Sequence, residues 1–167
     1  MVEAIPGFRD MAVLDGEPVY LFKKIQLLTQ DLYERFSKSH HELFNFFDID
    51  ELTIFSDNVI PTILHHLNII LLDILDDATP RQIGIIKGLQ EDLRTGRETT
   101  EERSYVFRVA AVDACEIIIE TAKSLPKAPP FLKNMTAEQL DAYLWQLSKK
   151  AALRDIVRFS DPNTVFF

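Results

Sequence analysis

IDELTIFSDNVIP, residues Ile49–Pro61, is the stretch around which the rest of the chain is organised. Its polar turn, Ser56-Asp57-Asn58, joins a short acidic segment to the start of a helix and places one carboxylate between two apolar segments. Burying a carboxylate costs free energy unless the group is paired or hydrogen-bonded, and such groups gather at functional sites. Asp57 is therefore the first candidate for a functional residue.

The composition indicates a globular protein. The chain has 167 residues, of which 47% are hydrophobic and 26% charged, so we expect one domain, 1–167, with a core of useful size. The formal net charge of −8 argues against binding long nucleic acid, which needs a basic face. A single nucleotide needs only one or two cations and is not excluded.

Cysteine content and hydropathy indicate the cellular compartment to expect for the protein. Cys115 is the only cysteine, so no disulfide framework can form, and an intracellular, cytoplasmic setting is favoured. Its apolar helical surroundings predict a buried core thiol. The longest apolar run, 60–75, is interrupted by polar residues and is too short to span a membrane, and the N-terminus lacks the order of a signal peptide.

The sequence carries no recognisable motif for a metal or a cofactor. It has neither GxGxxG nor GxxxxGK and only five glycines, so a phosphate loop is not expected. His65 and His66 are adjacent, so they point to different faces of a helix, and no third ligand lies at metal spacing. We expect neither a metal nor a cofactor.

Apolar spacing predicts an all-α fold, an irregular multi-helix domain with a short extended piece near the N-terminus. In the first helix the apolar residues recur every three or four positions on one stripe. The helix after residue 99 is apolar nearly all round at Ile117-Ile118-Ile119, which is typical of a central helix. The expected helices are Pro18–Ser37, Val59–Leu67, one from Thr79-Pro80 to Gly96, Thr100–Ser124 and Ala137–Lys150.

Local signals set the expected boundaries. Pro18 suits the first turn of a helix, Asn68 suits a left-handed cap, and three pairs have the spacing of capping boxes. The segment 125–134 holds three prolines and is expected to be a stiff connector without helix. The extended piece is Phe8–Leu14, and the three pairs are Asp48 with Glu51, Thr99 with Glu102, and Thr136 with Gln139.

Five polar or aromatic residues stand out as carriers of chemistry: Lys23, Asp50, Asp57, Asp141 and Trp145. A buried carboxylate beside an aromatic wall can act on an N-glycosidic bond, because it can attack the ribose or stabilise its developing positive charge. An aromatic plate can stack on a base. Asp141 and Trp145 share a helix face at i and i+4. The residues alone leave open a helical module with capping acids and a core tryptophan.

The central segment Phe46–Leu67, FFDIDELTIFSDNVIPTILHHL, resembles the signature of the queuosine salvage proteins, a family of queuosine 5′-phosphate N-glycosylase/hydrolases. Flanking segments resemble the same family in the same order and at similar spacing. They are Phe8-Arg9-Asp10, Phe22–Leu28, Arg108–Glu116 and Asp141-Ala142-Tyr143-Leu144-Trp145.

The resemblance implies hydrolysis of queuosine 5′-phosphate, a small-molecule nucleotide, to queuine for tRNA modification and ribose 5-phosphate. Asp57 matches the motif aspartate, as nucleophile or electrostatic stabiliser, and Lys23 matches a helix lysine that would contact substrate oxygens or this aspartate. Asp50 and Asp141 would bind polar edges of the base or ribose, and Trp145 would stack. Asn58, where the family has tyrosine, is a further candidate for substrate binding.

Several positions depart from the family pattern. Val59 replaces the arginine expected two residues after the motif aspartate, Val106 replaces a glutamate, and the tail 159–167 replaces a basic ending. Family members are longer, and this chain matches their C-terminal part, so we expect it to be part of a longer protein. Two alternatives follow: a non-catalytic remnant that binds a nucleotide or base on the same fold, and a helical interaction protein without a ligand.

Overall fold

The computed structural model describes residues 2–161 and 164–166, so Pro162, Asn163 and Phe167 of the tail lie outside the described residues. It confirms a predominantly helical fold with one short two-stranded sheet in the described part of the chain. The elements in chain order are η1 (Pro6–Phe8), β1 (Met11–Leu14), β2 (Glu17–Tyr20), α1 (Lys23–Phe36), α2 (His41–Phe44), η2 (Ile49–Glu51), α3 (Val59–His66), α4 (Pro80–Thr95), α5 (Glu101–Ser124), α6 (Pro130–Lys133), α7 (Ala137–Ser148) and α8 (Ala151–Arg154).

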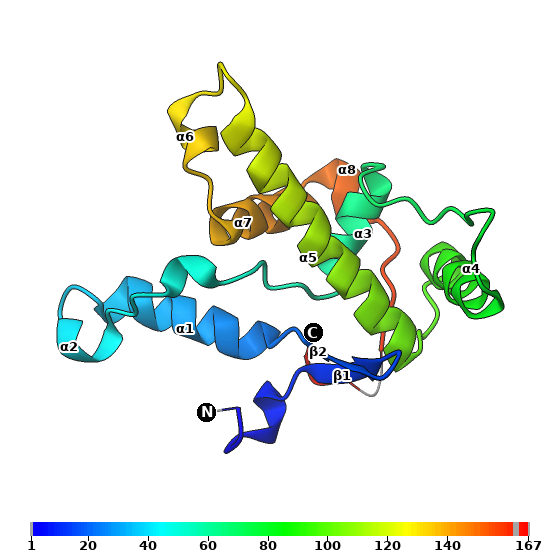
Figure 1. Ribbon diagram of the computed structural model, residues 1–167, viewed down its shortest axis with the longest axis horizontal. Coiled ribbons are helices and arrows are strands. Elements are labelled where there is room, and N and C mark those ends of the chain that lie inside the picture. Colours follow the sequence, from blue (N-terminus) through cyan, green and yellow to red (C-terminus); the bar gives the residue numbers. More distant parts are fainter. Residues whose placement is uncertain (1, 162–163, 167) are drawn as a thin grey trace.

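The long helix α5 is the centre of the fold, as its apolar pattern predicts. It crosses the molecule and contacts α3, α4, α6, α7 and β1 (Figure 1). The core lies where α3, α5 and α7 meet, and it includes Ile63, Leu64, Phe107, Ala111 and Leu144. Cys115 is part of this core, and burial raises the pKa of its thiol to about 12, which confirms the buried thiol.

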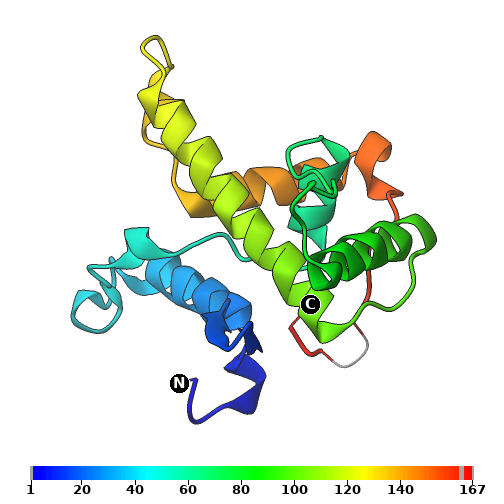
Figure 2. The ribbon, with the colours of Figure 1, turned by 45° about the vertical axis from the view of Figure 1, so that its right-hand side comes forward.

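Helix α1 is attached differently from the other long helices. It lies on one side of α5, while α4 lies on the other (Figure 2). None of the residues of α1 is buried, although its partly covered side includes the predicted apolar stripe. Because burial of apolar area contributes in proportion to the area removed from water, packing alone holds α1 weakly. Its position therefore depends on polar contacts.

The N-terminal hairpin corrects two predictions. Asp15 and Gly16 have φ values of 54° and 86°, which a two-residue hairpin turn requires, so Leu14 pairs with Glu17 and the chain continues as β2. Pro18 therefore lies in a strand, opposite Val13, and α1 begins at Lys23. Pairs with and without hydrogen bonds alternate in such a ladder, so the missing N–H of Pro18 falls between two bonded pairs. The extended piece is also shorter than expected, since residues 6–8 form η1.

Cap predictions had mixed outcomes. Thr136 and Gln139 form a capping box at α7, and Asn68 has a left-handed φ of 57°, as predicted. The side chain of Asp48 caps nothing, because the following segment is only one 3₁₀ turn. The cap of α5 is Thr100, one residue later than predicted, and its hydroxyl accepts from the Arg103 N–H.

The connector prediction was also wrong in part, since α6 lies inside 125–134 and begins at Pro130, where a missing N–H is tolerated. The tail of the chain runs back along the body. Glu98 forms an isolated parallel bridge with Ser160, and Phe159 is buried against Phe107. Within the described residues, no helix is long and apolar enough to cross a membrane.

Two glycines on or beside α4 provide a paired test of the backbone. Gly84 lies within the helix with open space where a Cβ would lie, so Gly84→Ala should stabilise the protein by about 1 kcal/mol through helix propensity. Gly96 caps the helix at φ 68°, and a Cβ there would lie 3.2 Å from Val157 Cγ1. Gly96→Ala should therefore destabilise it by about 1–2 kcal/mol. Urea unfolding of both variants measures the two changes in stability, which should have opposite signs. An equal effect would contradict the assignment of Gly96 as the helix cap.

Candidate active site

A cavity of about 340 Å³ opens where α1 faces the start of α7 and the segment before α3. It is lined by four of the six residues that the sequence singled out: Lys23, Asp57, Asp141 and Trp145. Its size is within the range of small-molecule sites. These four residues come from three separate segments of the chain, so the fold brings together groups that linear spacing could only suggest.

Lys23 and Asp57 form an ion pair in the lining of this cavity. Lys23 Nζ lies 3.1 Å from Asp57 Oδ2, and the side chains are only 14% and 9% exposed. The other carboxylate oxygen, Oδ1, accepts from the Val59 N–H at 2.7 Å, which fixes Asp57 at the start of α3. The carboxylate therefore has a defined orientation, and its charge is balanced by one ammonium group.

Asp141 lies beside this pair on the first half of α7. Its Oδ1 accepts from the Phe55 N–H at 2.9 Å, and the residue is buried. The pKa of Asp141 is raised to about 6, mainly by burial; the Phe55 bond opposes this shift, and the nearby charge of Asp57 contributes to it. The site thus holds two neighbouring carboxyl groups in different surroundings, one paired with Lys23 and one able to carry a proton near neutral pH.

Trp145 provides the aromatic wall one helical turn after Asp141. Its side chain lines the cavity and remains 44% exposed. Lys149 Nζ lies 3.2 Å from the centroid of the indole ring. A base could therefore stack only on the opposite face.

Three further acidic side chains line the cavity, beside the apolar Leu27, Phe55 and Ala142. Asp31 and Glu34 of α1 and Glu138 of α7 line it, together with Gln30. Burial raises the pKa of Glu138, and the charge of Glu34 raises it further. Among the described residues that line the cavity, Lys23 is the only cation, and it already pairs with Asp57.

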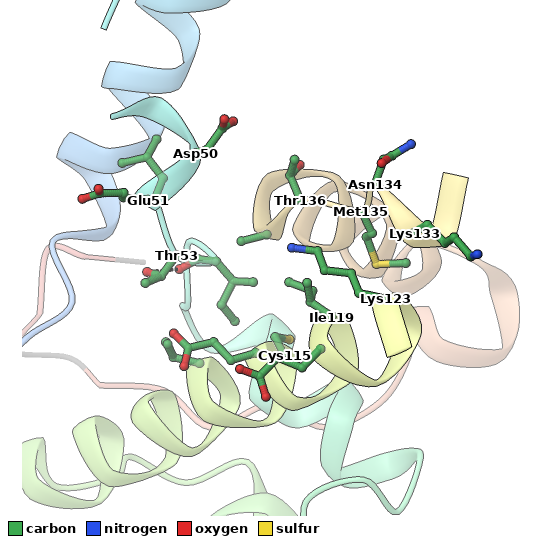
Figure 3. A pocket seen from close by; sticks show the side chains of 16 residues that line it. Asp50, Glu51, Thr53, Cys115, Ile119, Lys123, Lys133, Asn134, Met135 and Thr136 are labelled. Atoms are coloured by element: carbon green, nitrogen blue, oxygen red, sulfur yellow. Dashed lines mark hydrogen bonds between the residues drawn. The ribbon is translucent and has the colours of Figure 1, made fainter. Parts of the chain in front are cut away.

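Asp50 and Asn58 lie outside this cavity, although they are close to Asp57 in sequence. Asp50 is exposed on η2 and lines a separate hollow of about 480 Å³ together with residues 51–54. In Figure 3 it lies at one side of that hollow, with Cys115 at the opposite side. A smaller hollow of about 190 Å³ also reaches Asp50 and shares Gln30 and Glu138 with the main cavity. Asn58 Nδ2 instead donates to the Phe159 carbonyl at 3.0 Å and anchors the tail.

Two buried charges beside the site were not selected from the sequence. Asp10 and Arg108 are fully buried and paired, with Nη1 to Oδ1 at 2.9 Å and Nη2 to Oδ2 at 2.5 Å. They lie 98 residues apart, so no spacing could connect them. The one indication of this ion pair in the sequence is Arg108 itself, because a buried arginine in a central apolar helix needs a partner.

In the described part of the chain, no group of three or more His, Cys, Asp or Glu residues is placed to hold a metal ion. The arrangement offers instead a fixed carboxylate, a neighbouring carboxyl that can donate a proton, an ammonium group and an aromatic plate. These are the groups that cleavage of a bond between a base and a sugar needs, because positive charge develops on the sugar and the base leaves with a proton.

Comparison with known proteins identifies the family of this chain. A family model described as queuosine salvage protein matches residues 1–167. Queuosine 5′-phosphate N-glycosylase/hydrolase from Sphaerobacter thermophilus is 37% identical over 123 residues, which cover 70% of this chain and 38% of that protein. The protein of the same name from Schizosaccharomyces pombe is 27% identical over 145 residues, covering 87% of this chain and 36% of the relative.

A third relative of that name, from Dictyostelium discoideum, is 38% identical over 64 residues, covering 38% of this chain and 19% of its own length. The chain thus spans well under half the length of the curated relatives it matches. The family match nevertheless extends over the whole sequence, and it includes every segment that lines the cavity. The protein therefore belongs to the queuosine salvage protein family.

Proposed function

We propose that this chain hydrolyses the N-glycosidic bond of queuosine 5′-phosphate, releasing queuine and ribose 5-phosphate. The observation that carries the proposal is the Lys23–Asp57 pair, 3.1 Å apart, in a cavity that also contains Asp141 and Trp145. The names of three relatives state the same activity.

In the proposed reaction, the bond between the base nitrogen and C1′ of the ribose breaks. Asp57 supplies negative charge to C1′, either by electrostatic stabilisation or by attack, as positive charge develops there. Asp141 supports departure of the base, because its raised pKa of about 6 leaves a fraction protonated near neutral pH. Water then adds its hydroxyl to C1′, which breaks the Asp57–C1′ bond where Asp57 has attacked, and the proton of the water returns Asp141 to its acid form. Lys23 orients Asp57 and contacts ribose oxygens.

The second candidate function is binding of the base or nucleotide without turnover. One observation favours it: the cavity wall carries five carboxyl groups, of Asp31, Glu34, Asp57, Glu138 and Asp141, and a single ammonium group in the described residues. A phosphate group would therefore meet few cations there. The free base, which carries no phosphate, fits this charge better.

The deciding experiment incubates the purified chain with queuosine 5′-phosphate and measures queuine and ribose 5-phosphate by chromatography and mass spectrometry. We expect the two products in equal amounts. Queuosine without phosphate and guanosine 5′-phosphate test whether the phosphate and the modified base are needed. A parallel titration with queuine measures binding. Binding without product would support the second function, and neither binding nor product would exclude both.

A further inference from the structure

The Lys23–Asp57 pair joins two segments that apolar packing holds together only weakly. Lys23 is the first residue of α1, none of whose residues is buried, whereas Asp57 lies in the core segment before α3. Phe22, which precedes Lys23, has a left-handed φ of 49° and offers no side-chain cap to the helix. Polar contacts must therefore fix the first turn of α1 against the core. Gln26 supplies two of them, since its Nε2 donates to Thr53 Oγ1 and its Oε1 accepts from the Thr53 N–H, both at 3.0 Å. The start of the helix at Lys23 needs a further contact.

The buried carboxylate of Asp10 provides the contact that holds the start of α1. Its Oδ2 accepts from the Lys23 N–H at 3.1 Å, so it caps α1 from outside the helix. Its backbone carbonyl accepts from the N–H groups of Leu21 and Phe22 at 3.0 and 3.1 Å. The same carboxylate binds both Nη atoms of Arg108, and its Oδ1 also accepts from the Tyr105 hydroxyl at 2.9 Å.

Arg108 extends this connection to the other member of the pair. Its Nε donates to the Ser56 carbonyl at 3.0 Å, and the Ser56 hydroxyl donates to the Arg108 carbonyl at 2.9 Å. Ser56 directly precedes Asp57. The contacts therefore form a closed ring that runs from the Lys23 backbone through Asp10, Arg108 and Ser56 to Asp57, and back to the Lys23 ammonium group.

We propose that Asp10 and Arg108 are positioning residues for the reaction: their buried ion pair sets the distance between the Lys23 ammonium group and the Asp57 carboxylate. Neither side chain lines the cavity, so neither touches substrate. This inference rests on the proposed function, since it assigns a role in that reaction. Displacement of a reacting group by about 1 Å can reduce the rate by about 10²-fold.

The test compares Asp10→Asn with Asp92→Asn in the full chain. Asp92 is also buried and also pairs with an arginine of α5, with Arg103 Nη1 at 2.6 Å from its Oδ2, but it does not line the cavity. In Asp10→Asn, we expect kcat to fall by about 10²-fold with KM within about threefold, because the binding surfaces stay in place. In Asp92→Asn, we expect both constants, corrected for folded fraction, to stay within about twofold.

Amide hydrogen exchange provides a readout that does not need activity. The Lys23 amide should lose protection in Asp10→Asn by about tenfold or more, and it should keep protection in Asp92→Asn. If the unmodified chain releases no queuine, the proposed function fails, while this comparison still decides whether Asp10 holds the first turn of α1. Unchanged kcat or unchanged protection of Lys23 in folded Asp10→Asn would overturn the inference.

Tyr105→Phe covers the case in which Asp10→Asn does not fold. This change removes one hydrogen bond to Asp10 and leaves the ion pair intact. We expect kcat to fall about three- to tenfold with KM unchanged, in line with the loss of about 1 kcal/mol of orientation. A kcat equal to that of the unmodified chain would overturn the inference in that case.

Discussion

Asp57→Asn should reduce kcat/KM for queuosine 5′-phosphate by roughly 10³-fold or more, which corresponds to about 4 kcal/mol of transition-state stabilisation. The substitution keeps an oxygen that can accept from the Val59 N–H, so α3 should still begin at the same place. It removes the negative charge that would face C1′ in the proposed reaction and turns an amide group toward the Lys23 ammonium group. The measurement is queuine release under single-turnover conditions.

Asp48→Asn is the matched control for this prediction, because it removes one exposed carboxylate from the same region and leaves the cavity lining unchanged. Its activity should equal that of the unmodified chain. Lys23→Met and the double variant with Asp57→Asn complete a cycle. If Lys23 and Asp57 act as one unit, the double variant should lose little more activity than Asp57→Asn alone. Additive losses would assign Lys23 to a separate contact with substrate.

The parts of the fold that the sequence predicts well are those whose signals are local. Helix α7 has a capping box and an apolar stripe within a few residues, and α3 begins at the polar turn of the central motif. The hairpin was missed in part because a proline such as Pro18 is tolerated both in the first turn of a helix and in a short edge strand. Only the two-residue turn at Asp15 and Gly16 distinguishes them, since it commits the chain to a second strand.

The site shows the same division between local and distant signals. Asp141 and Trp145 line one cavity because a helix places i and i+4 on one face, which spacing predicts. Asp50 is seven residues from Asp57 and yet lines a different hollow, because Asp50 lies on η2 and the irregular segment 52–56 separates it from Asp57. The Asp10–Arg108 pair was invisible to spacing, since its members meet only after the whole fold has formed.

Asp141→Asn should make the protein more stable at pH 7.5 while reducing its activity. Burial raises the pKa of Asp141 from 3.8 to about 6, so at neutral pH the folded protein carries a carboxylate in an unfavourable place. An amide avoids this penalty and still accepts from the Phe55 N–H. At about 1.4 kcal/mol per pH unit, the gain in unfolding free energy should be about 2–3 kcal/mol. Queuine release should fall by about 10²-fold, since the proton donor is lost.

The contribution of Asp141 to the stability of the fold depends on pH. Between about pH 4 and 6 the folded state binds a proton at Asp141 that the unfolded state has lost, so this group's contribution to stability decreases as the pH rises through that window. The advantage of Asp141→Asn should thus be small near pH 4 and complete above about pH 7. Asp113→Asn, which removes an exposed carboxylate on α5, should show no such trend. Urea unfolding at several pH values measures the stability of both variants. If Asp141→Asn is less stable than the unmodified chain at pH 7.5, the carboxylate stabilises the fold. Greater stability together with lower activity would instead show that the buried acid is kept for chemistry at the expense of stability.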